Sequence, residues 1–206
     1  MREKGSLDAM GKLQHRMKRA FDIIGALIGL ALCSPLFLVI SILITYQSNG
    51  PIFFRQIRIG YKGRPFAIFK FRTMSSIVEE EGPQLVAKCD SSNSTRLEQF
   101  LRGHHLDELP QLWNVLRGDM SFVGPRPERK YFIDKILRHT DRYQLIYEMK
   151  PGLTSEATLY NGYTDTMEKM LKRMEMDIHY LEHRTLWLDF TIIVKTVVNI
   201  LTGKKF

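Results

Sequence analysis

Cysteine is scarce in this sequence of 206 residues: only Cys33 and Cys89 are present, which argues against a small disulfide-stapled scaffold. One cysteine lies in an apolar run and the other in a polar stretch, so we expect no disulfide framework and a reducing compartment. Internal repeats and low-complexity tracts are also missing. The first apolar run lacks a small-residue cleavage site, so no cleavable signal peptide is expected.

Acidic residues are in the minority. The chain has 22 Asp and Glu against 30 Lys and Arg, which gives a formal net charge of +8. This excess predicts anionic partners: nucleic acid, nucleotide phosphates or lipid headgroups. The hydrophobic content of 44% is enough for a core, and the length fits one domain with modest appendages.

Residues 20–46 form a long apolar run in which Asp22 is the only charge. The run exceeds the roughly 20 residues that span a bilayer as a helix. Ser34-Pro35 in its middle predicts a break, because proline removes a backbone donor and clashes with the preceding turn. The Ser34 hydroxyl is a candidate partner for a carbonyl that Pro35 frees.

Basic residues flank this run on both sides, and positive charge marks the cytoplasmic side of a membrane. Two topologies follow from the residues. One is a re-entrant helix hairpin, broken at Ser34-Pro35, that enters and leaves by the same face. The other is a kinked helix that spans the bilayer. The flanking basic residues are Lys12, Arg16, Lys18 and Arg19 before the run, and Arg55, Arg58, Lys62 and Arg64 after it.

Two aromatic-rich stretches between residues 51 and 74 flank Gly60-Tyr61-Lys62-Gly63, and this pattern predicts a β-hairpin. Most of its basic side chains are expected to face solvent or lipid headgroups. Residues 75 to 93 are acidic and then polar, which predicts a surface loop.

Helix signals follow this loop. Thr95 and Glu98 form a capping-box pattern that starts a short helix. We expect Asp107 to cap a second helix and Gly118 to end it. Asp107 and Glu108 would then lie at the positive end of a helix dipole, a setting that favours ionised carboxylates and attracts anions. For an isolated Asp-Glu pair, an ordinary N-cap with an acidic first turn is the default interpretation. The adjacent pair His104-His105 has no further spaced ligands, so no metal site is assigned to it.

Together these motifs resemble those of the monotopic phosphoglycosyl transferases, the bacterial sugar transferase family that starts glycan assembly on undecaprenyl phosphate. The resemblance runs from about Arg16 to Leu201. Each motif alone is weak, but so many in one order make a chance match improbable. In chain order they are Ser34-Pro35, Phe54-Arg55-Gln56, Phe69-Lys70-Phe71-Arg72-Thr73-Met74, Leu106-Asp107-Glu108-Leu109-Pro110-Gln111-Leu112-Trp113-Asn114, Gly118-Asp119-Met120-Ser121, Gly124-Pro125-Arg126-Pro127 and Lys150-Pro151-Gly152-Leu153-Thr154.

The resemblance implies a mechanism. Asp107 would be the nucleophile that attacks the β-phosphate of a UDP-sugar, so that UMP leaves and a phospho-sugar stays on the carboxylate. Polyprenol phosphate would then attack this intermediate and release a polyprenol diphosphate-sugar. A carboxylate suits this role because an acyl phosphate stays reactive enough for the second step.

The resemblance also implies Mg²⁺ as cofactor, with Asp107 as its protein ligand, because hard oxygen ligands and phosphates suit this ion. Glu108 would orient Asp107 or support the metal. Arg126, between two prolines that preset the backbone, suits a bidentate phosphate contact. Lys70 and Arg102 are expected to face the same site.

One region departs from the family pattern. Ser155 to Gly162 stand where many relatives have Gly-Leu-Ala-Gln, so the donor sugar cannot be carried over. Residues 164 to 184 predict an amphipathic helix whose methionines form core packing. Asp177 and Tyr180 on this helix lie where relatives keep similar residues, and they are additional site candidates.

The C-terminal segment, residues 186–206, has an apolar face, and Trp187 suits a membrane interface. Asp189 and Lys195 make a spanning helix costly. An in-plane amphipathic helix and an ordinary core helix are both consistent with this pattern.

The sequence therefore predicts an α/β-associated, mostly helical, single small domain with an N-terminal re-entrant membrane helix hairpin and interfacial amphipathic helices. Its parts are a basic tail (1–19), the membrane segment (20–46) and a catalytic domain on the cytoplasmic face of the bacterial inner membrane (47–206). The expected partners are a UDP-sugar, polyprenol phosphate and membrane lipids, and no nucleic acid.

Two other function classes fit some of these features. A metal-dependent phosphatase or pyrophosphatase could act on the same nucleotide sugars. A non-enzymatic basic membrane protein that binds acidic lipid or nucleic acid would explain the charge and the hydrophobicity, but not the carboxylate pair beside Arg102 and Arg126.

Overall fold

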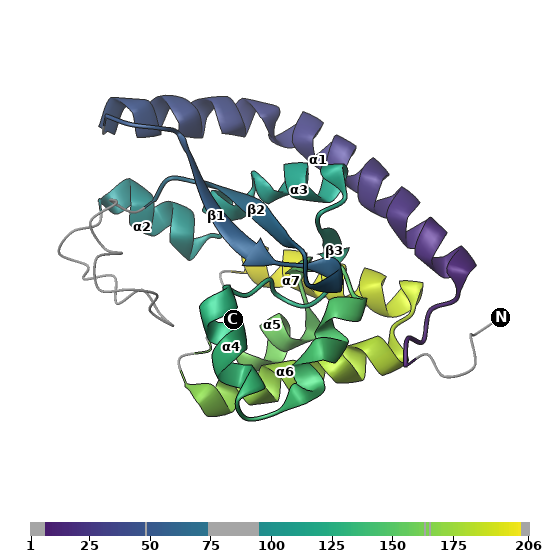
Figure 1. Cartoon of the computed structure of the whole chain (residues 1–206). Coiled ribbons are helices and arrows are strands. Elements are labelled where there is room, and N and C mark those ends of the chain that lie inside the picture. The colour runs from purple at the N-terminus through teal and green to yellow at the C-terminus, as the bar shows by residue number, and fades with distance from the viewer. Residues whose placement is uncertain (1–6, 48, 74–94, 163, 165, 203–206) are drawn as a thin grey trace.

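The computed structural model describes residues 7–47, 49–73, 95–162, 164 and 166–202. Over this part of the chain the protein is a mostly helical small domain with one long apolar N-terminal helix, α1, lying along its upper edge (Figure 1). The acidic loop expected at residues 75 to 93 falls outside the described residues.

The elements follow one another with short connections. In chain order they are α1 (Lys12–Gln47), β1 (Phe53–Ile59), the 3₁₀ turn η1 (Tyr61–Gly63), β2 (Pro65–Phe71), α2 (Arg96–Gly103), the 3₁₀ turn η3 (Leu106–Glu108), α3 (Gln111–Arg117), β3 (Ser121–Val123), α4 (Lys130–Leu137), the 3₁₀ segment η4 (Asp141–Glu148), β4 (Gly152–Thr154), α5 (Glu156–Asn161), α6 (Met167–His183) and α7 (Leu186–Leu201).

Helix α1 passes through Ser34-Pro35 without interruption and includes Pro35 among its residues. Figure 1 shows the helix bent near its middle, as expected for a proline that clashes with the preceding turn. The Ala31 carbonyl, which would have accepted the missing amide of Pro35, accepts instead from Ser34 Oγ at 2.8 Å. The predicted role of the Ser34 hydroxyl is confirmed, whereas the re-entrant course of α1 through a membrane stays a prediction.

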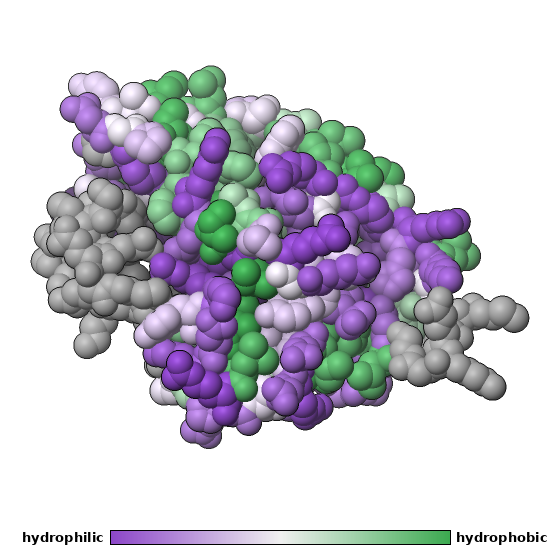
Figure 2. Space-filling view, viewed as in Figure 1, coloured by the Kyte–Doolittle hydropathy of each residue, from purple (hydrophilic) through white to green (hydrophobic). Residues whose placement is uncertain are grey.

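Among the described helices, α1 is the one long and apolar enough to cross a membrane. It begins at Lys12, so the basic residues before the apolar run belong to the helix. Its outer side is covered with exposed hydrophobic residues, which form the green band along the upper edge of the molecule in Figure 2. They include Phe21, Ile24, Leu27, Ile28, Leu32, Leu38, Val39 and Ile42.

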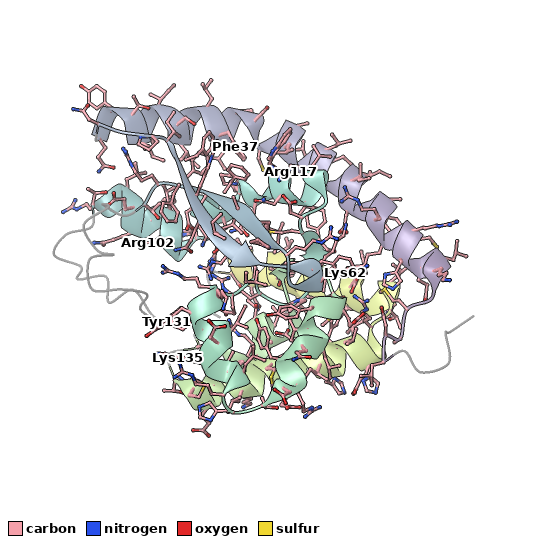
Figure 3. The ribbon with its side chains drawn as sticks, viewed as in Figure 1. Phe37, Lys62, Arg102, Arg117, Tyr131 and Lys135 are labelled. Carbon is pink, nitrogen blue, oxygen red and sulfur yellow. The ribbon has the colours of Figure 1, made fainter. Side chains whose placement is uncertain are left out.

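The inner side of α1 packs closely on the domain because small residues face it. A Cβ atom added at Gly25 would lie 2.8 Å from the Phe122 ring, and one at Gly29 would lie 3.2 Å from Leu112 Cδ1. Further along the helix, Phe37 points toward the hairpin (Figure 3), and its ring centroid is 5.2 Å from that of Phe71. The helix is therefore seated on the domain along one face and exposed along the other.

The predicted hairpin is confirmed. Strands β1 and β2 pair antiparallel, with Phe53 opposite Phe71 and Ile59 opposite Pro65. The turn uses a positive φ at Lys62 and at Gly63, which matches the Lys62-Gly63 signal in the sequence. This ribbon runs beneath α1 and carries Lys70 near its end.

The helix starts and ends predicted after residue 94 are confirmed, except for the helix cap predicted at Asp107. Thr95 accepts from Glu98 N–H and Glu98 accepts from Thr95 N–H, so the capping box starts α2 as predicted. Gly118 ends α3 with a φ of 95°. The expected cap by Asp107 is wrong: Pro110 occupies the cap position of α3, and Asp107 lies in the 3₁₀ turn before it. Both carboxylates belong to this turn, and Glu108, Leu109 and Pro110 separate Asp107 from the first residue of α3, so Asp107 is not the cap residue.

The second sheet is small but central. Strands β3 and β4 pair in parallel, with Ser121 opposite Gly152 and Val123 opposite Thr154. Below it, α4, η4, α6 and α7 enclose the largest hydrophobic cluster, to which α6 contributes Met170 and Met174 as core residues. The methionine stripe is thus core packing, as predicted.

Helix α7 packs on the domain, and its position in a membrane interface stays a prediction. Ile192 and Asp189 are buried on the side that faces β3 and α5. On the other side Trp187 and Phe190 are exposed and stack with ring centroids 5.5 Å apart. The helix therefore packs on the domain by one face and presents apolar side chains on the opposite face.

Candidate active site

The carboxylate pair lies in η3, between α2 and α3 and against β2. His105, just before the turn, has a φ of 54°, a left-handed conformation that reverses the chain direction after α2. The chain then places Asp107 and Glu108 at the end of the β1–β2 ribbon, where Lys70 stands on β2. Asp107 is buried, with 7% of its surface exposed, although it is a charged residue type.

One carboxylate oxygen of Glu108 contacts two cationic side chains. Its Oε1 lies 2.6 Å from Lys70 Nζ and 3.3 Å from Arg126 Nη2. Burial by itself would raise the pKa of Glu108, but Lys70 and Arg126 outweigh it and hold that pKa well below its usual range. Glu108 is therefore ionised at any physiological pH. The structure brings three of the predicted site residues into direct contact.

Asp107 has the opposite electrostatic balance. Burial raises its pKa to about 6, although Lys70 pulls it down; the negative charge of Glu108 adds to the increase. This differs from the expectation that the setting favours ionised carboxylates, because the two cations are shared with Glu108 and the desolvation of Asp107 is not fully offset. The ionised carboxylate of Asp107 is thus an undercompensated anion that a positive charge would stabilise.

Arg126 is presented by a rigid loop. Gly124 N–H donates to Thr154 O at 3.1 Å, and Gly152 N–H donates to Pro125 O at 2.9 Å. A Cβ atom at Gly124 would lie 2.2 Å from the Lys150 carbonyl, so only glycine fits where the two strands meet. The side chain of Arg126 is more than a third exposed, and Glu108 raises the pKa of its guanidinium. It can therefore contact Glu108 and still reach a ligand.

Arg102 comes from another element. It lies in the last turn of α2, the helix that packs beside η3, and it is partly buried (Figure 3).

Asp177 lies behind Arg126, inside the domain. It lines a cavity with Arg126, Arg173, Glu128 and Tyr143, and burial raises its pKa to about 7. Two buried atoms in this cavity, Asp177 Oδ1 and Arg173 Nε, have no hydrogen-bond partner. The structure thus places Asp177 beside Arg126 rather than beside the η3 carboxylates.

Tyr180 belongs to a different buried cluster. Its hydroxyl donates to Asp189 Oδ1 on α7, and Asp189 Oδ2 accepts from Lys18 Nζ of α1 at 2.5 Å. The Tyr180 ring is almost fully buried, which raises the pKa of its hydroxyl well above the usual value. Asp177 and Tyr180, the two site candidates on α6, therefore lie in separate buried clusters.

The Mg²⁺ ion that the family resemblance implies stays a prediction. Within the described residues no three His, Cys, Asp or Glu side chains gather as a metal cage. Mg²⁺ is commonly held by one or two carboxylates together with substrate phosphates and water. Because Glu108 already carries two cations and Asp107 is undercompensated, Asp107 is the group that fits this ion.

Three charged residues on the buried side of Arg126 were not predicted from the sequence: Arg58, Glu128 and Arg173. Arg58 donates to Pro127 O at 3.1 Å and lies 3.7 Å from Glu128, which is 3.9 Å from Arg173. Burial lowers the pKa of Arg58 to about 10. Most basic side chains of the hairpin are expected to face solvent or headgroups, and Arg58, with 15% of its side chain exposed, is an exception. No local signal marks Arg58 in the sequence, because its partner Pro127 lies 69 positions away.

Comparison with known proteins adds an independent observation. A profile of the family described as "Bacterial sugar transferase" matches residues 13–203, nearly the whole chain. A UDP-glucose:undecaprenyl-phosphate glucose-1-phosphate transferase of Caulobacter vibrioides is 42% identical over 188 residues, which cover 90% of this chain and 70% of that protein.

Other relatives are longer. A UDP-N-acetylgalactosamine-undecaprenyl-phosphate N-acetylgalactosaminephosphotransferase of Aeromonas hydrophila is 40% identical over 91% of this chain, but over only 44% of its own length. For a UDP-glucose:undecaprenyl-phosphate glucose-1-phosphate transferase of Escherichia coli the identity is 39%, over 88% of this chain and 39% of that protein. The chain thus spans less than half the length of these two relatives.

Proposed function

Because the chain belongs to the bacterial sugar transferase family, we propose that it transfers a sugar 1-phosphate from a UDP-sugar to undecaprenyl phosphate and releases UMP. The observation that carries the proposal is the buried pair in η3. One carboxylate, Glu108, is saturated by Lys70 and Arg126, and its neighbour Asp107 is left undercompensated beside the same cations. This pattern suits a nucleophile that meets an anionic phosphate.

The reaction has two displacement steps. First, an Asp107 carboxylate oxygen bonds to the β-phosphorus, and the bond from that phosphorus to the bridging oxygen breaks, so the oxygen leaves with UMP. Next, a phosphate oxygen of undecaprenyl phosphate attacks the same phosphorus, and the carboxylate of Asp107 leaves. The product is undecaprenyl diphosphate-sugar, and the enzyme returns to its starting state.

The cationic side chains around Asp107 assist both displacement steps by offsetting negative charge. Lys70 and Arg126, which Glu108 holds at 2.6 and 3.3 Å, offset the charge of the diphosphate as it approaches a carboxylate. Arg126 can form a two-pronged contact with a phosphate because its loop fixes its backbone. Arg102 adds charge from the α2 side. Mg²⁺ bound by Asp107 and the diphosphate would supply further charge neutralisation.

The long helix gives the enzyme its access to a lipid substrate. The exposed apolar side of α1 and the exposed aromatic pair on α7 supply surfaces for lipid contact. We place the protein at the cytoplasmic face of the bacterial inner membrane, with α1 entering and leaving by that face.

The decisive test of the function is a UMP-release screen. The purified full chain would be incubated with Mg²⁺, undecaprenyl phosphate and each member of a panel of UDP-sugars. We expect UMP release with at least one donor and only when the lipid is present, together with formation of a lipid-linked sugar. Free sugar phosphate formed without the lipid would instead identify a phosphatase or pyrophosphatase, and no release with any donor would contradict both enzymatic proposals.

The topology has a separate test. Single cysteines at Leu7 and at the exposed Arg138 would be introduced in a chain lacking Cys33 and Cys89, and intact cells would be treated with an impermeant thiol reagent. A re-entrant α1 keeps both positions in the cytoplasm, so both resist labelling until the membrane is opened. Labelling of Leu7→Cys alone in intact cells would identify a spanning helix.

A further inference from the structure

Two charged residues of α1 bind the main chain of β3. Asp22 Oδ1 accepts from the Phe122 N–H and from Ser121 Oγ, both at 3.0 Å. One helical turn earlier, Lys18 Nζ donates to the Val123 carbonyl at 3.0 Å. The membrane helix is therefore fixed in register with a strand of the catalytic domain, by a donor at one residue of the strand and an acceptor at the next.

Lys18 also takes part in a second set of buried contacts, with residues of α7 and α6. Its ammonium pairs with Asp189 of α7, and Asp189 accepts from the Tyr180 hydroxyl of α6. The side chains of Lys18 and Asp189 are 11% and 9% exposed. Three elements, α1, β3 and α7, thus meet at one ammonium group, and α6 joins them through the contact between Tyr180 and Asp189.

Stability alone is a weak explanation for such a cluster. Burying two charges costs much of what their attraction returns, and well-packed apolar residues often stabilise a core equally well. What charged groups add is a defined geometry, because each donor and acceptor has a required direction. These contacts therefore fix the position of the segment that they hold.

The strand leads directly to the active site. Val123 is followed by Gly124 and Pro125, which are held by hydrogen bonds to Thr154 and Gly152, and then by Arg126. The Gly124 and Gly152 backbones approach so closely that a Cβ atom added at Gly152 would lie 2.2 Å from Gly124 N, so the segment is packed tightly against β4. A displacement of Val123 is therefore passed on to Arg126, whose guanidinium lies 3.3 Å from Glu108.

We propose that Lys18, together with Asp22, Asp189 and Tyr180, acts as a positioning cluster that couples the seating of the membrane helix to the placement of Arg126. The proposal rests on the proposed function, in which Arg126 contacts the donor phosphates. In this arrangement the catalytic cation is aligned only when α1 is seated on the domain. Lys18 and Tyr180 touch no substrate, so they act through Arg126.

The test is a double-mutant cycle measured on the full chain with UDP-sugar and undecaprenyl phosphate. Lys18→Met keeps the aliphatic length and removes the charge. We expect it to lower kcat/KM for the donor about tenfold while KM for the lipid stays unchanged. In an Arg126→Lys background the same change should cost less than about twofold, because the aligned group is already gone. Lys18→Arg, which still offers donors to Val123 and Asp189, should restore most of the activity.

Arg19 supplies a matched control. It is the next residue on α1 and donates to the carbonyls of Val115 and Leu116 at 2.6 and 2.7 Å, at the end of α3 rather than on β3. Arg19→Met removes a similar anchor and is expected to lower Tm to a similar degree. Its effect on donor kcat/KM should be small and should be the same in both Arg126 backgrounds.

Equal losses from Lys18→Met in the wild-type and Arg126→Lys backgrounds would overturn the proposal, as would a folded Lys18→Met protein with unchanged kinetics. If Lys18→Met does not fold, Tyr180→Phe replaces it, since it removes a single hydroxyl; a loss of about threefold is expected that disappears with Arg126→Lys. A wild-type protein that releases no UMP from any UDP-sugar would instead refute the proposed function. The two failures are therefore distinguishable.

Discussion

Two buried aspartates, in different regions of the molecule, have similar electrostatics and different surroundings. The pKa of Asp107 is raised to about 6 and that of Asp177 to about 7, in both cases chiefly by burial. Asp107 stands in a three-residue turn next to a carboxylate that holds two cations. Asp177 stands in the middle of the 17-residue helix α6, in the largest core cluster, with Arg173 as its main attraction.

The comparison shows that a raised pKa does not by itself identify a reactive carboxylate. Burial produces the shift in both regions, and burial is as common in a core as in an active site. What differs is the supply of cations that a phosphate could use: Lys70 and Arg126 on one side, and the occupied pair of Arg173 and Glu128 on the other. Arg126 borders both regions, because it contacts Glu108 and also lines the cavity of Asp177.

The largest expected effect comes from Asp107→Asn. The substitution keeps shape and removes the nucleophile, so turnover should fall by at least about a thousandfold. Stability should not fall, because the change removes a carboxylate whose ionisation the fold disfavours. UMP release and Tm would be measured on the same preparation. Near-normal UMP release by the folded variant would remove Asp107 from the mechanism.

A smaller effect is expected from Glu108→Gln. The amide cannot balance Lys70 and Arg126, so both cations lose their anchor, and the charge that raises the pKa of Asp107 disappears. We expect kcat/KM to fall about a hundredfold, with the nucleophile intact. Trapping of the phospho-sugar intermediate on Asp107 in this variant would separate its role from that of Asp107. A loss as complete as that of Asp107→Asn, with no intermediate, would instead make Glu108 part of the chemical step.

Arg126→Lys tests the residue that the two regions share. Charge is retained, but a point ammonium cannot reproduce a planar two-pronged contact, so kcat/KM for the donor should fall roughly ten- to thirtyfold. The loss should be clearest at limiting UDP-sugar in a UMP-release assay. Full activity under that condition would reduce Arg126 to a surface cation.

Sequence reasoning succeeded where the signal is local. The capping box at Thr95 and Glu98 and the stop at Gly118 depend on residues within one turn, and the structure contains both. Asp107 was misplaced as a helix cap because a 3₁₀ turn before α3 has the same local pattern. The convergence of Lys70 and Glu108 came from the family resemblance, since 38 residues separate them.

Contacts between distant segments of the chain could not be predicted from the sequence. The Lys18–Asp189 pair joins residues 171 positions apart, and no spacing rule predicts it. One signal was available at Asp22, the only charge in a long apolar run. A lone carboxylate in such a helix is expected to face protein rather than lipid, and the structure shows that it faces β3.

The smallest effect on activity, and the clearest on stability, is expected from Asp177→Asn. An Asp in an unfolded chain titrates near pH 4, whereas Asp177 in the fold titrates at about 7. Between these values the folded state binds the extra proton, so the stability of the wild-type protein falls as pH rises from about 4 to about 7. Asparagine cannot ionise, and the variant avoids this loss.

We therefore expect Asp177→Asn to be more stable than wild type at pH 8 by on the order of 2 kcal/mol, which corresponds to a rise in Tm of roughly 5 °C. The difference should close as pH approaches 4, and turnover should change by less than about threefold. Thermal unfolding of both proteins from pH 4 to 8 would test this, with UMP release measured in parallel. Because neither Asp107→Asn nor Asp177→Asn is expected to destabilise the fold, a loss of turnover in either variant can be assigned to catalysis. A collapse of turnover in Asp177→Asn at unchanged stability would place Asp177 among the groups that act on the substrate, and the distinction between the two aspartates would fail.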